Sequence, residues 1–345
     1  MLWGLIALAS LASADYTPPV YSVDLTVSPQ TRWNHIYPAY SSVLKQVIAQ
    51  ALQQLNSAEI FLIANALKLH YLTKETKGEI EGCAAFLDVS YNEVAIMQFL
   101  YELLNGCTSI IYRQANDTLV HGRNLDFDFA PLLREMVINV DFYRGTEYVY
   151  TATTFPCYFG VISGSKPGAF SVSVDERYDH SETLAFIRNL LGLVTFREGN
   201  TFALRKAMET LSTWKEAVHY LSTVPIVAPT YYIVAGLSGN EGVVITRDRW
   251  TAANFWYLNS TSWFLVETNY DHWKPQPSDD DRADPAIRMM KTLGQTGLDV
   301  PSFFGLFDTY PVLQQNLTVY TTIMSPATGF YDTLVRQNAS QVFLH

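Results

Sequence analysis

Residues that could support nucleophilic catalysis lie close together in one stretch, NGCTSIIYRQANDTLVHGRNLDFDF, which spans 105–129. Cys107 stands near its start, Arg123 follows sixteen residues later, and Asp126 comes three residues after that. A cysteine thiolate is a strong nucleophile, and a neighbouring cation stabilises it. A carboxylate can orient an amine or the guanidinium. On these residues alone, a buried cysteine with an exposed arginine–aspartate pair is favoured over a catalytic set.

The same stretch has the pattern of a β-hairpin. The segments TSIIYRQ and TLVHGRN are rich in strand-forming residues, and they flank the turn residues Asn116 and Asp117. If Cys107 begins one strand and Arg123 lies on its antiparallel partner, both reach the same end of the sheet. The hairpin would then carry the thiol, the guanidinium and the carboxylate.

Helical and strand patterns alternate in blocks along the rest of the chain. Helical spacing predicts two helices in 41–72 and a third over 90–105, where Ser90 and Glu93 form a capping box. The order helices, strands, helices, strands favours an α+β fold with two antiparallel sheets packed face to face between helical layers. The other predicted strands are 135–155 (two strands), 157–163, 168–176, 230–236, 241–248, 254–258, 262–269 and 316–325, and the other predicted helices are 182–192, 200–223 and 285–294.

The bulk composition limits the classes of function. Of 345 residues, 48% are hydrophobic and only 16% are charged, which supplies a core and disfavours disorder. The net charge is -10 without a basic stripe, so no nucleic-acid partner is predicted. The seven histidines lack ligand spacing, and no H-E-x-x-H, Walker or paired C-x-x-C motif occurs, so neither a metal nor a cofactor is predicted. His121 on the hairpin is expected to be structural.

The beginning of the chain has the features of a secretory signal. Residues 1–14 predict a signal peptide, with an apolar run that ends at Leu11 and a small-residue cleavage site at 12–14. This run is shorter than the roughly 20 residues that span a bilayer, which disfavours an anchoring helix. Four glycosylation sequons support export. They begin at Asn116, Asn259, Asn316 and Asn338.

The chain has three cysteines, and an odd number leaves at least one thiol free. So few cysteines in a chain of this length do not form a disulfide scaffold. We therefore expect Cys83 and Cys157 to be small buried apolar residues. Cys107 is the candidate nucleophile.

Four blocks of sequence carry a resemblance to a known family. They are CTSI…HGRNLDF after Cys107, DERY at 175–178, ITRDR at 245–249 and ETNYDHWKPQPSDDDR at 267–282. The chain resembles the acid ceramidase and N-acylethanolamine acid amidase family, N-terminal-nucleophile hydrolases of the cholylglycine hydrolase group. The resemblance implies an αββα sandwich and a precursor that cuts itself at Gly106–Cys107. An α-chain of residues 15–106, mainly helical, and a catalytic β-chain of residues 107–345 would remain together as a heterodimer.

The resemblance also implies roles for single residues. Cys107 would be the nucleophile, with its freed α-amino group as the base, while Arg123 and Asp126 position the amine and polarise the thiol. Asn269 would donate to the oxyanion. Arg282 matches the family's second arginine, and Glu176 matches a carboxylate that holds the arginine network. Gly106 departs from the larger apolar residue that the family has before its cysteine, which bears on the rate of self-cleavage.

The implied activity is that of a lysosomal cysteine amidase that hydrolyses N-acylethanolamines to a fatty acid and ethanolamine. The protein is also expected to be secreted in part. Hydrolysis of ceramide to sphingosine and a fatty acid is the alternative. A non-catalytic lipid-binding protein is the alternative from another class. The apolar segment 60–72 is either a buried helix or a surface for peripheral membrane contact.

Overall fold

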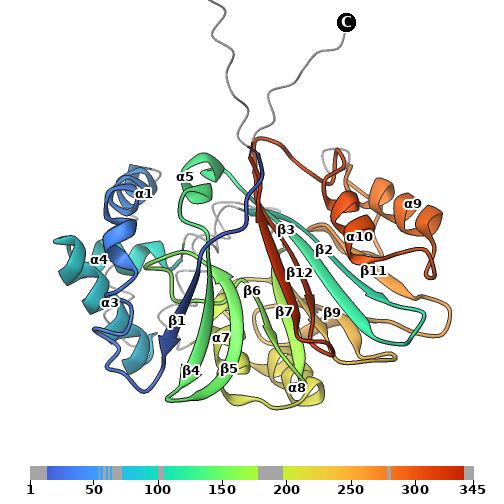
Figure 1. Cartoon of the computed structure of the whole chain (residues 1–345), viewed down its shortest axis with the longest axis horizontal. Coiled ribbons are helices and arrows are strands. Elements are labelled where there is room, and N and C mark those ends of the chain that lie inside the picture. Colours follow the sequence, from blue (N-terminus) through green and yellow to red (C-terminus); the bar gives the residue numbers. More distant parts are fainter. Residues whose placement is uncertain are drawn as a thin grey trace, which may run out of the picture.

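Two β-sheets packed face to face form the centre of the molecule, and helices cover the outer face of each (Figure 1). The computed structural model describes residues 14–53, 55–56, 60, 63, 72–99, 105–177, 197–277 and 281–337. The helices α7 (Asn200–Thr210) and α8 (Trp214–Thr223) pack on the larger sheet, and α9 (Ala283–Leu293) and α10 (Val300–Phe307) on the smaller one. This layering confirms the predicted α+β sandwich.

The larger sheet has eight strands in the order β1-β4-β5-β6-β7-β8-β9-β10. All neighbours pair antiparallel except β1 and β4, which run parallel, so the prediction of two purely antiparallel sheets was wrong at this edge. A parallel pair requires a long connection, and β1 lies far upstream of β4 in the chain. The strands are β1 (Val20–Asp24), β4 (Ile138–Arg144), β5 (Glu147–Thr154), β6 (Ser163–Lys166), β7 (Phe170–Glu176), β8 (Thr230–Ala235), β9 (Gly242–Arg247) and β10 (Ala252–Tyr257).

The smaller sheet has the order β11-β2-β3-β12-β13, with the predicted hairpin at its centre. Asp117 in the hairpin turn has a positive φ of 73°, a conformation that aspartate tolerates better than most residues. Side chains of β2 and β3 alternate between the larger sheet and the helices α9 and α10. The strands are β11 (Phe264–Glu267), β2 (Asn105–Arg113), β3 (Leu119–Phe127), β12 (Thr318–Ser325) and β13 (Phe330–Val335).

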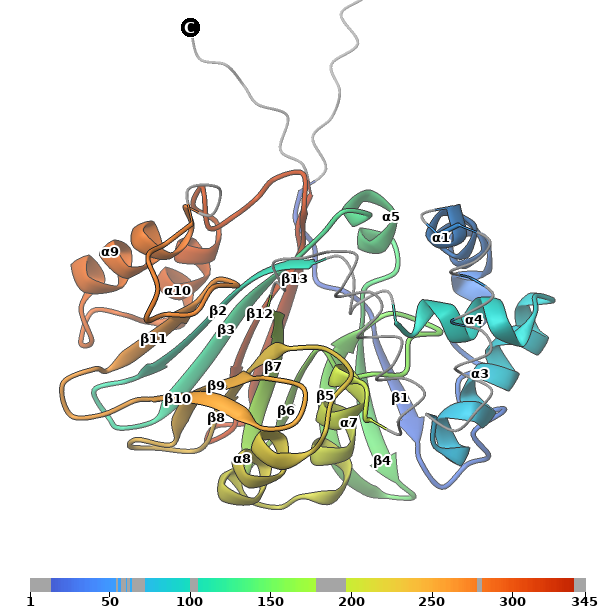
Figure 2. The same cartoon turned by 180° about the vertical axis from the view of Figure 1, so that it is seen from behind.

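The segment upstream of Cys107 supplies helices beside β1 and β4 (Figure 2). The predicted capping box of Ser90 and Glu93 begins α4, but α4 ends at Met97 rather than near residue 105, and Asn105 is already the first residue of β2. Most of 60–72 and all of 182–192 lie outside the described residues, as do residues 1–13. No helix in the described part of the chain has the length and apolarity to span a bilayer. The remaining helices are η1 (Tyr37–Ala39), α1 (Ser41–Gln53), α3 (Lys74–Leu87), α4 (Tyr91–Met97) and α5 (Ala130–Arg134).

The prediction for two of the three cysteines was wrong. Cys83 on α3 and Cys157 after β5 form a disulfide across 74 residues of sequence. Cys157 has a positive φ of 62° in a turn, and the strand predicted over 157–163 does not form; β6 begins only at Ser163. The chain returns to α3 at this turn, which brings the two sulfur atoms together. Cys107 is the remaining cysteine; it is buried and takes no part in this disulfide.

A buried charged cluster also joins the upstream segment to the rest. Glu79 of α3 is fully buried and accepts hydrogen bonds from the indole nitrogen of Trp33 and from Arg205 of α7, each at 3.0 Å. Breaking a buried ion pair of this kind costs about 3–5 kcal/mol, because it leaves an unpaired charge in the core. The disulfide, the β1–β4 pairing and this cluster therefore all connect residues before Cys107 to residues after it.

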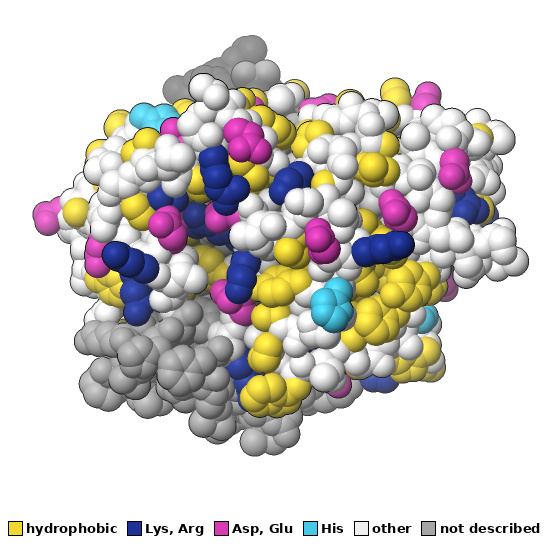
Figure 3. Space-filling view, turned by 90° about the horizontal axis from the view of Figure 1, so that it is seen from below, with side chains coloured by type: hydrophobic (Ala, Val, Ile, Leu, Met, Phe, Trp, Pro, Cys, Tyr) yellow, Lys and Arg dark blue, Asp and Glu magenta, His cyan; other side chains and the backbone are white. Residues whose placement is uncertain are grey.

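Apolar side chains remain exposed around the edge strand β10. The rings of Phe255 and Tyr257 stack with centroids 5.8 Å apart, and Trp214 of α8 packs edge-on against Tyr257. Figure 3 views the molecule from below and shows hydrophobic side chains gathered on one side of that face. Of the rings named, Phe255 and Tyr257 are each 40% exposed.

Candidate active site

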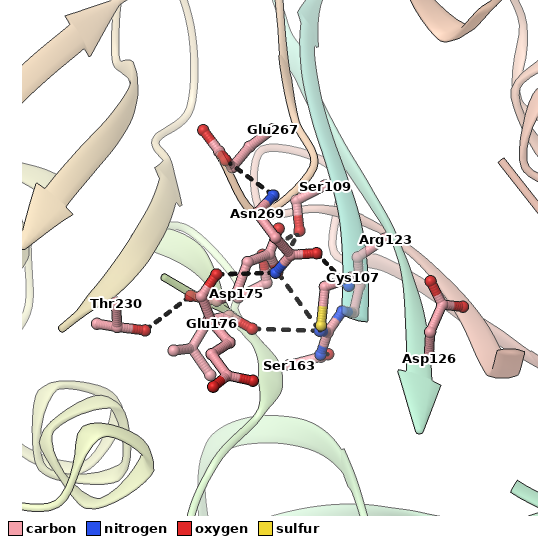
Figure 4. Close-up of polar contacts among 12 residues, drawn as sticks. Cys107, Ser109, Arg123, Asp126, Ser163, Asp175, Glu176, Thr230, Glu267 and Asn269 are labelled. Atoms are coloured by element: carbon pink, nitrogen blue, oxygen red, sulfur yellow. Dashed lines mark hydrogen bonds and ion pairs between the residues drawn. The ribbon is translucent and has the colours of Figure 1, made fainter. Parts of the chain in front are cut away.

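The hairpin divides the predicted residues between its two faces. In the β2–β3 register Cys107 lies opposite Leu125, and Ser109 lies opposite Arg123, so these four side chains share the face toward the larger sheet. Asp126 lies opposite Gly106, on the other face. Figure 4 shows the Asp126 side chain pointing away from Cys107 and Arg123. The thiol and guanidinium are therefore brought together as predicted, whereas the carboxylate is not beside them.

The Cys107 thiol and the Arg123 guanidinium are in direct contact. Nη2 of Arg123 lies 2.7 Å from Sγ of Cys107, and both side chains are fully buried. Nη1 donates to the hydroxyl of Ser163 on β6 at 3.0 Å, and Nη2 also donates to the carbonyl of Val174 on β7 at 3.2 Å. The guanidinium is thus fixed by the opposite sheet. A cation held at this distance stabilises a thiolate.

The carboxylate nearest to Arg123 is Asp175, which the sequence analysis missed. Its Oδ1 lies 3.4 Å from Nη2 of Arg123 and accepts a hydrogen bond from Ser109 at 2.9 Å. Burial raises the pKa of Asp175 to about 6, although Arg123 opposes this effect. Its Oδ2 has no hydrogen-bond partner among the residues that the structure describes. At a pH near 6, about half of the Asp175 carboxyl groups are therefore protonated.

The predicted carboxylate, Glu176, is the next residue of β7 and lies on the opposite face of that strand. Its main-chain carbonyl takes part in the site, accepting a hydrogen bond from Nδ2 of Asn269 at 2.8 Å. Figure 4 shows its side chain directed away from Cys107. The alternation in FSVSVDE carried the signal, because it places Asp175 on the same face as Ser171 and Ser173.

A chain of hydroxyl groups continues behind Asp175 between the sheets. Ser109 contacts Ser173 at 2.9 Å, and Ser173 contacts Nε2 of His121 at the same distance. Burial, assisted by the charge of Arg123, lowers the pKa of His121 to about 3. His121 is therefore neutral and fully buried, which confirms the structural role expected for it.

On the other face of the hairpin, Asp126 forms an ion pair with Arg282. Oδ2 of Asp126 lies 3.1 Å from Nη1 of Arg282, and Oδ1 accepts from the hydroxyl of Thr318 at 2.5 Å. The same Nη1 donates to the main-chain carbonyl of Cys107 at 2.8 Å. Burial raises the pKa of Asp126, and the charge of Arg282 opposes it. This pair holds the backbone of the cysteine rather than its thiol.

Asn269 reaches the site from the segment after β11. Its Oδ1 accepts from the main-chain nitrogen of Cys107 at 2.7 Å and from Nη2 of Arg282 at 2.9 Å. The structure thus brings this predicted residue to the nitrogen of the Gly106–Cys107 peptide bond. Arg282, immediately before α9, and Asn269 together hold the carbonyl and the nitrogen of Cys107.

Gly106 lies beside this second face, with the chain continuous through the Gly106–Cys107 bond. A Cβ atom at Gly106 would lie 3.4 Å from Nη1 of Arg282 and 3.5 Å from Cβ of Asp126, which is ordinary van der Waals contact. The backbone here does not require glycine. A larger residue would instead extend its side chain toward the Arg282–Asp126 pair.

Two sequon asparagines occupy exposed turns. Oδ1 of Asn116 and of Asn259 each accepts a hydrogen bond from the threonine hydroxyl of its own sequon. Asn316 is also exposed, but Thr318 of its sequon is fully buried and bonded to Asp126. Asn338 lies outside the described residues.

Known proteins are similar to this chain over nearly its whole length. It is 37% identical over 338 residues to the N-acylethanolamine-hydrolyzing acid amidase of Caenorhabditis elegans, covering 93% of each chain. It is 31% identical over 342 residues to human acid ceramidase, covering 92% of this chain and 86% of the relative. A solved structure of a C. elegans N-acylethanolamine-hydrolyzing acid amidase ortholog superposes with a TM-score of 0.59 at 40% identity, covering 64% of this chain and 93% of that one. No protein-family model matches the chain.

The sandwich and its solved relative define the class of protein: an N-terminal-nucleophile hydrolase, which acts on amide bonds. Within that class, the chain belongs to the family of N-acylethanolamine acid amidases and acid ceramidases, as the matched sequence blocks indicated.

Proposed function

We propose that this protein is a cysteine amidase that hydrolyses N-acylethanolamines to a fatty acid and ethanolamine, after cutting its own Gly106–Cys107 bond. One observation carries the proposal. The thiol of Cys107 contacts Arg123 at 2.7 Å while the nitrogen of the same residue is held by Asn269 at 2.7 Å. Thiol and nitrogen are the two groups that an N-terminal nucleophile needs in fixed positions.

In the self-cleavage step, Sγ of Cys107 attacks the carbonyl carbon of Gly106. A thioester C–S bond forms, the C–N bond breaks, and the released nitrogen takes up a proton. Water then hydrolyses the thioester, which leaves a carboxylate on Gly106, a free thiol and a free α-amine on Cys107. The contact of Arg282 with the Cys107 carbonyl at 2.8 Å supports this assignment, because it restrains the residue while its preceding bond is replaced.

In the substrate step, the α-amine accepts the thiol proton and the thiolate attacks the fatty-acyl carbonyl. Arg123 stabilises the thiolate, and Nδ2 of Asn269 is the donor that we assign to the oxyanion. The tetrahedral intermediate collapses, ethanolamine leaves with the proton, and water hydrolyses the acyl-thioester. Asp126 acts through Arg282, and Glu176 contributes its carbonyl as the resting partner of Asn269.

We assign the mature protein as an αβ heterodimer of residues 15–106 and 107–345 in the lysosome, reached by the secretory route. The Cys83–Cys157 disulfide supports this route, because disulfides persist in oxidising compartments. The exposed Asn116 and Asn259 suit glycosylation there. Peripheral membrane contact through 60–72 belongs to the same proposal, since the lipid substrate resides in membranes.

Ceramide is the second candidate substrate, on the observation that human acid ceramidase is 31% identical to this chain. The higher identity to the C. elegans amidase, 37%, favours ethanolamides. A non-catalytic lipid carrier has no use for a buried thiol in contact with an ordered guanidinium, so the geometry of Cys107 and Arg123 argues against it.

The test compares a saturated long-chain acylethanolamide with the ceramide of the same acyl chain, in identical detergent micelles at acid pH. We expect kcat/KM for the ethanolamide to be at least ~10-fold higher, a difference of about 1.4 kcal/mol in transition-state binding. Cys107→Ala should abolish turnover of both. Equal rates or a preference for ceramide would move the protein to the ceramidase branch, and activity in Cys107→Ala would refute the mechanism.

A further inference from the structure

Asn269 has an unusual backbone conformation for a residue placed at a catalytic position. Its φ is +77°, in the left-handed region, which most non-glycine residues seldom adopt and which asparagine tolerates better than most. Contacts from the surroundings decide whether the residue stays in this conformation. The direction of the Asn269 side chain depends on it, and that side chain contacts the nitrogen of Cys107.

One side chain restrains this backbone directly. Oε1 of Glu267, two residues earlier, accepts a hydrogen bond from the main-chain nitrogen of Asn269 at 3.1 Å (Figure 4). Glu267 is the last residue of β11 and pairs with Ser109 of β2, so its own backbone is fixed by the sheet that carries Cys107. Glu267 is 1% exposed.

Glu267 lies close to other buried acidic groups. After burial, Asp175 on β7 acts on it most strongly, followed by the hydrogen bond from the Asn269 nitrogen, which lowers the pKa of Glu267, and by Asp271 in the following segment; Tyr231 on β8 also faces it. Burial and these two acids raise the pKa of Glu267 well above its ordinary value. A neutral carboxyl can accept a hydrogen bond through one oxygen without placing a charge in the core.

We infer that Glu267 is a positioning residue for the reaction: it locks Asn269 in the left-handed conformation and so directs the Asn269 carboxamide at Cys107. Glu267 does not touch the reacting atoms. The inference deepens the proposed function and rests on it, since it assigns the reason why Asn269 stands where an oxyanion donor is needed.

The kinetic test uses Glu267→Gln and Glu267→Leu, with Glu241→Gln as the matched control. Glutamine keeps an acceptor oxygen, and leucine removes it at similar volume. Glu241 likewise accepts from a backbone nitrogen, that of Leu237, but at the far end of β8. With the acylethanolamide as substrate at acid pH, we expect Glu267→Gln to keep kcat within about threefold and Glu267→Leu to lose at least ~10-fold in kcat with KM nearly unchanged. The control should match the unsubstituted protein.

The pH profile of the glutamine variant distinguishes a positioning role from a general loss of structure. The activity of Glu267→Gln should persist to higher pH than that of the unsubstituted protein, because the glutamine cannot ionise beside Asp175 and Asp271. If Glu267→Leu does not fold, Glu267→Gln decides alone, and a loss above ~10-fold in its kcat overturns the inference.

A crystal structure of Glu267→Leu gives a readout that needs no turnover. The expected result is that Asn269 leaves the left-handed region and that its Oδ1 separates from the Cys107 nitrogen. An unchanged Asn269 would overturn the inference even in an active enzyme. If the unsubstituted protein hydrolyses no acylethanolamide, the proposed function fails, and this structure still decides whether Glu267 holds Asn269.

Discussion

Two arginines contact Cys107 from opposite faces of the β2–β3 hairpin, and they contact different parts of the residue. On the face toward the larger sheet, Arg123 contacts the thiol at 2.7 Å. On the face toward α9, Arg282 contacts the main-chain carbonyl at 2.8 Å. One guanidinium therefore acts on the nucleophilic atom, and the other on the backbone that carries it.

The partners of the two arginines differ in the same way. Arg282 pairs with Asp126 at 3.1 Å, and Thr318 fixes that carboxylate. Arg123 has Asp175 at 3.4 Å, an acid whose pKa burial raises to about 6. An arginine paired with an ionised carboxylate is a good anchor. An arginine whose partner carboxyl is partly protonated has less of its positive charge compensated, so it stabilises the thiolate more strongly. One face of the hairpin therefore polarises the thiol of Cys107, and the other face positions its backbone.

The largest effect is expected from removing the guanidinium that contacts the thiol of Cys107. Arg123→Ala removes the guanidinium that contacts Sγ and that lies beside Asp175, so kcat/KM for the acylethanolamide should fall by about 10³-fold. Arg123→Lys should recover part of this loss. Arg144→Ala, an exposed arginine at the end of β4, is the control. A fall of less than tenfold in a folded Arg123→Ala protein would contradict the role of this face.

A smaller effect is expected on the backbone face. Asp126→Asn keeps the shape but removes the charge that holds Arg282, so self-cleavage should slow by about 10²-fold while the thiol contact with Arg123 remains. The rate of appearance of the two chains on a reducing gel at acid pH measures it. Thr318→Val removes one hydrogen bond to the same carboxylate and should slow cleavage less. If Asp126→Asn matures at the unsubstituted rate, Asp126 has no part in positioning.

A further prediction concerns stability against pH and involves no catalytic step. Asp175 has a folded pKa of about 6 against an ordinary value of 3.8, so between these values the folded protein keeps a proton that the unfolded chain releases. Its contribution to the free energy of unfolding therefore falls as pH rises from about 4 to 6, by at most about 3 kcal/mol. Asp175→Asn should flatten this decline in Tm. Parallel Tm curves for the two proteins would show that Asp175 does not titrate in this window.

The sequence predicted local structure well where local patterns determine it. Alternation and the turn at Asn116 located the hairpin, and Ser90 and Glu93 located the start of α4. The odd separation of Arg123 and Asp126 already places them on opposite faces of one strand, so that part of the site was available from the sequence.

Contacts between distant segments could not be read in this way. The Cys83–Cys157 disulfide depends on a turn that returns to α3, and the parallel pairing of β1 with β4 depends on the path of the intervening chain. The role of Asp175 requires knowing that β7 faces β2 across the sandwich. These are properties of packing, to which periodicity and turn residues contribute little.

The central claim is that Cys107 becomes the first residue of a chain through its own chemistry. Mass spectrometry of the purified protein after incubation at acid pH, before and after reduction, tests it most directly. We predict one species without reductant, because Cys83 and Cys157 join the two chains, and two species after reduction, the larger beginning at Cys107; Cys107→Ala should stay uncut. An uncut chain in a protein that hydrolyses the amide, or a cut at another bond, would contradict the account.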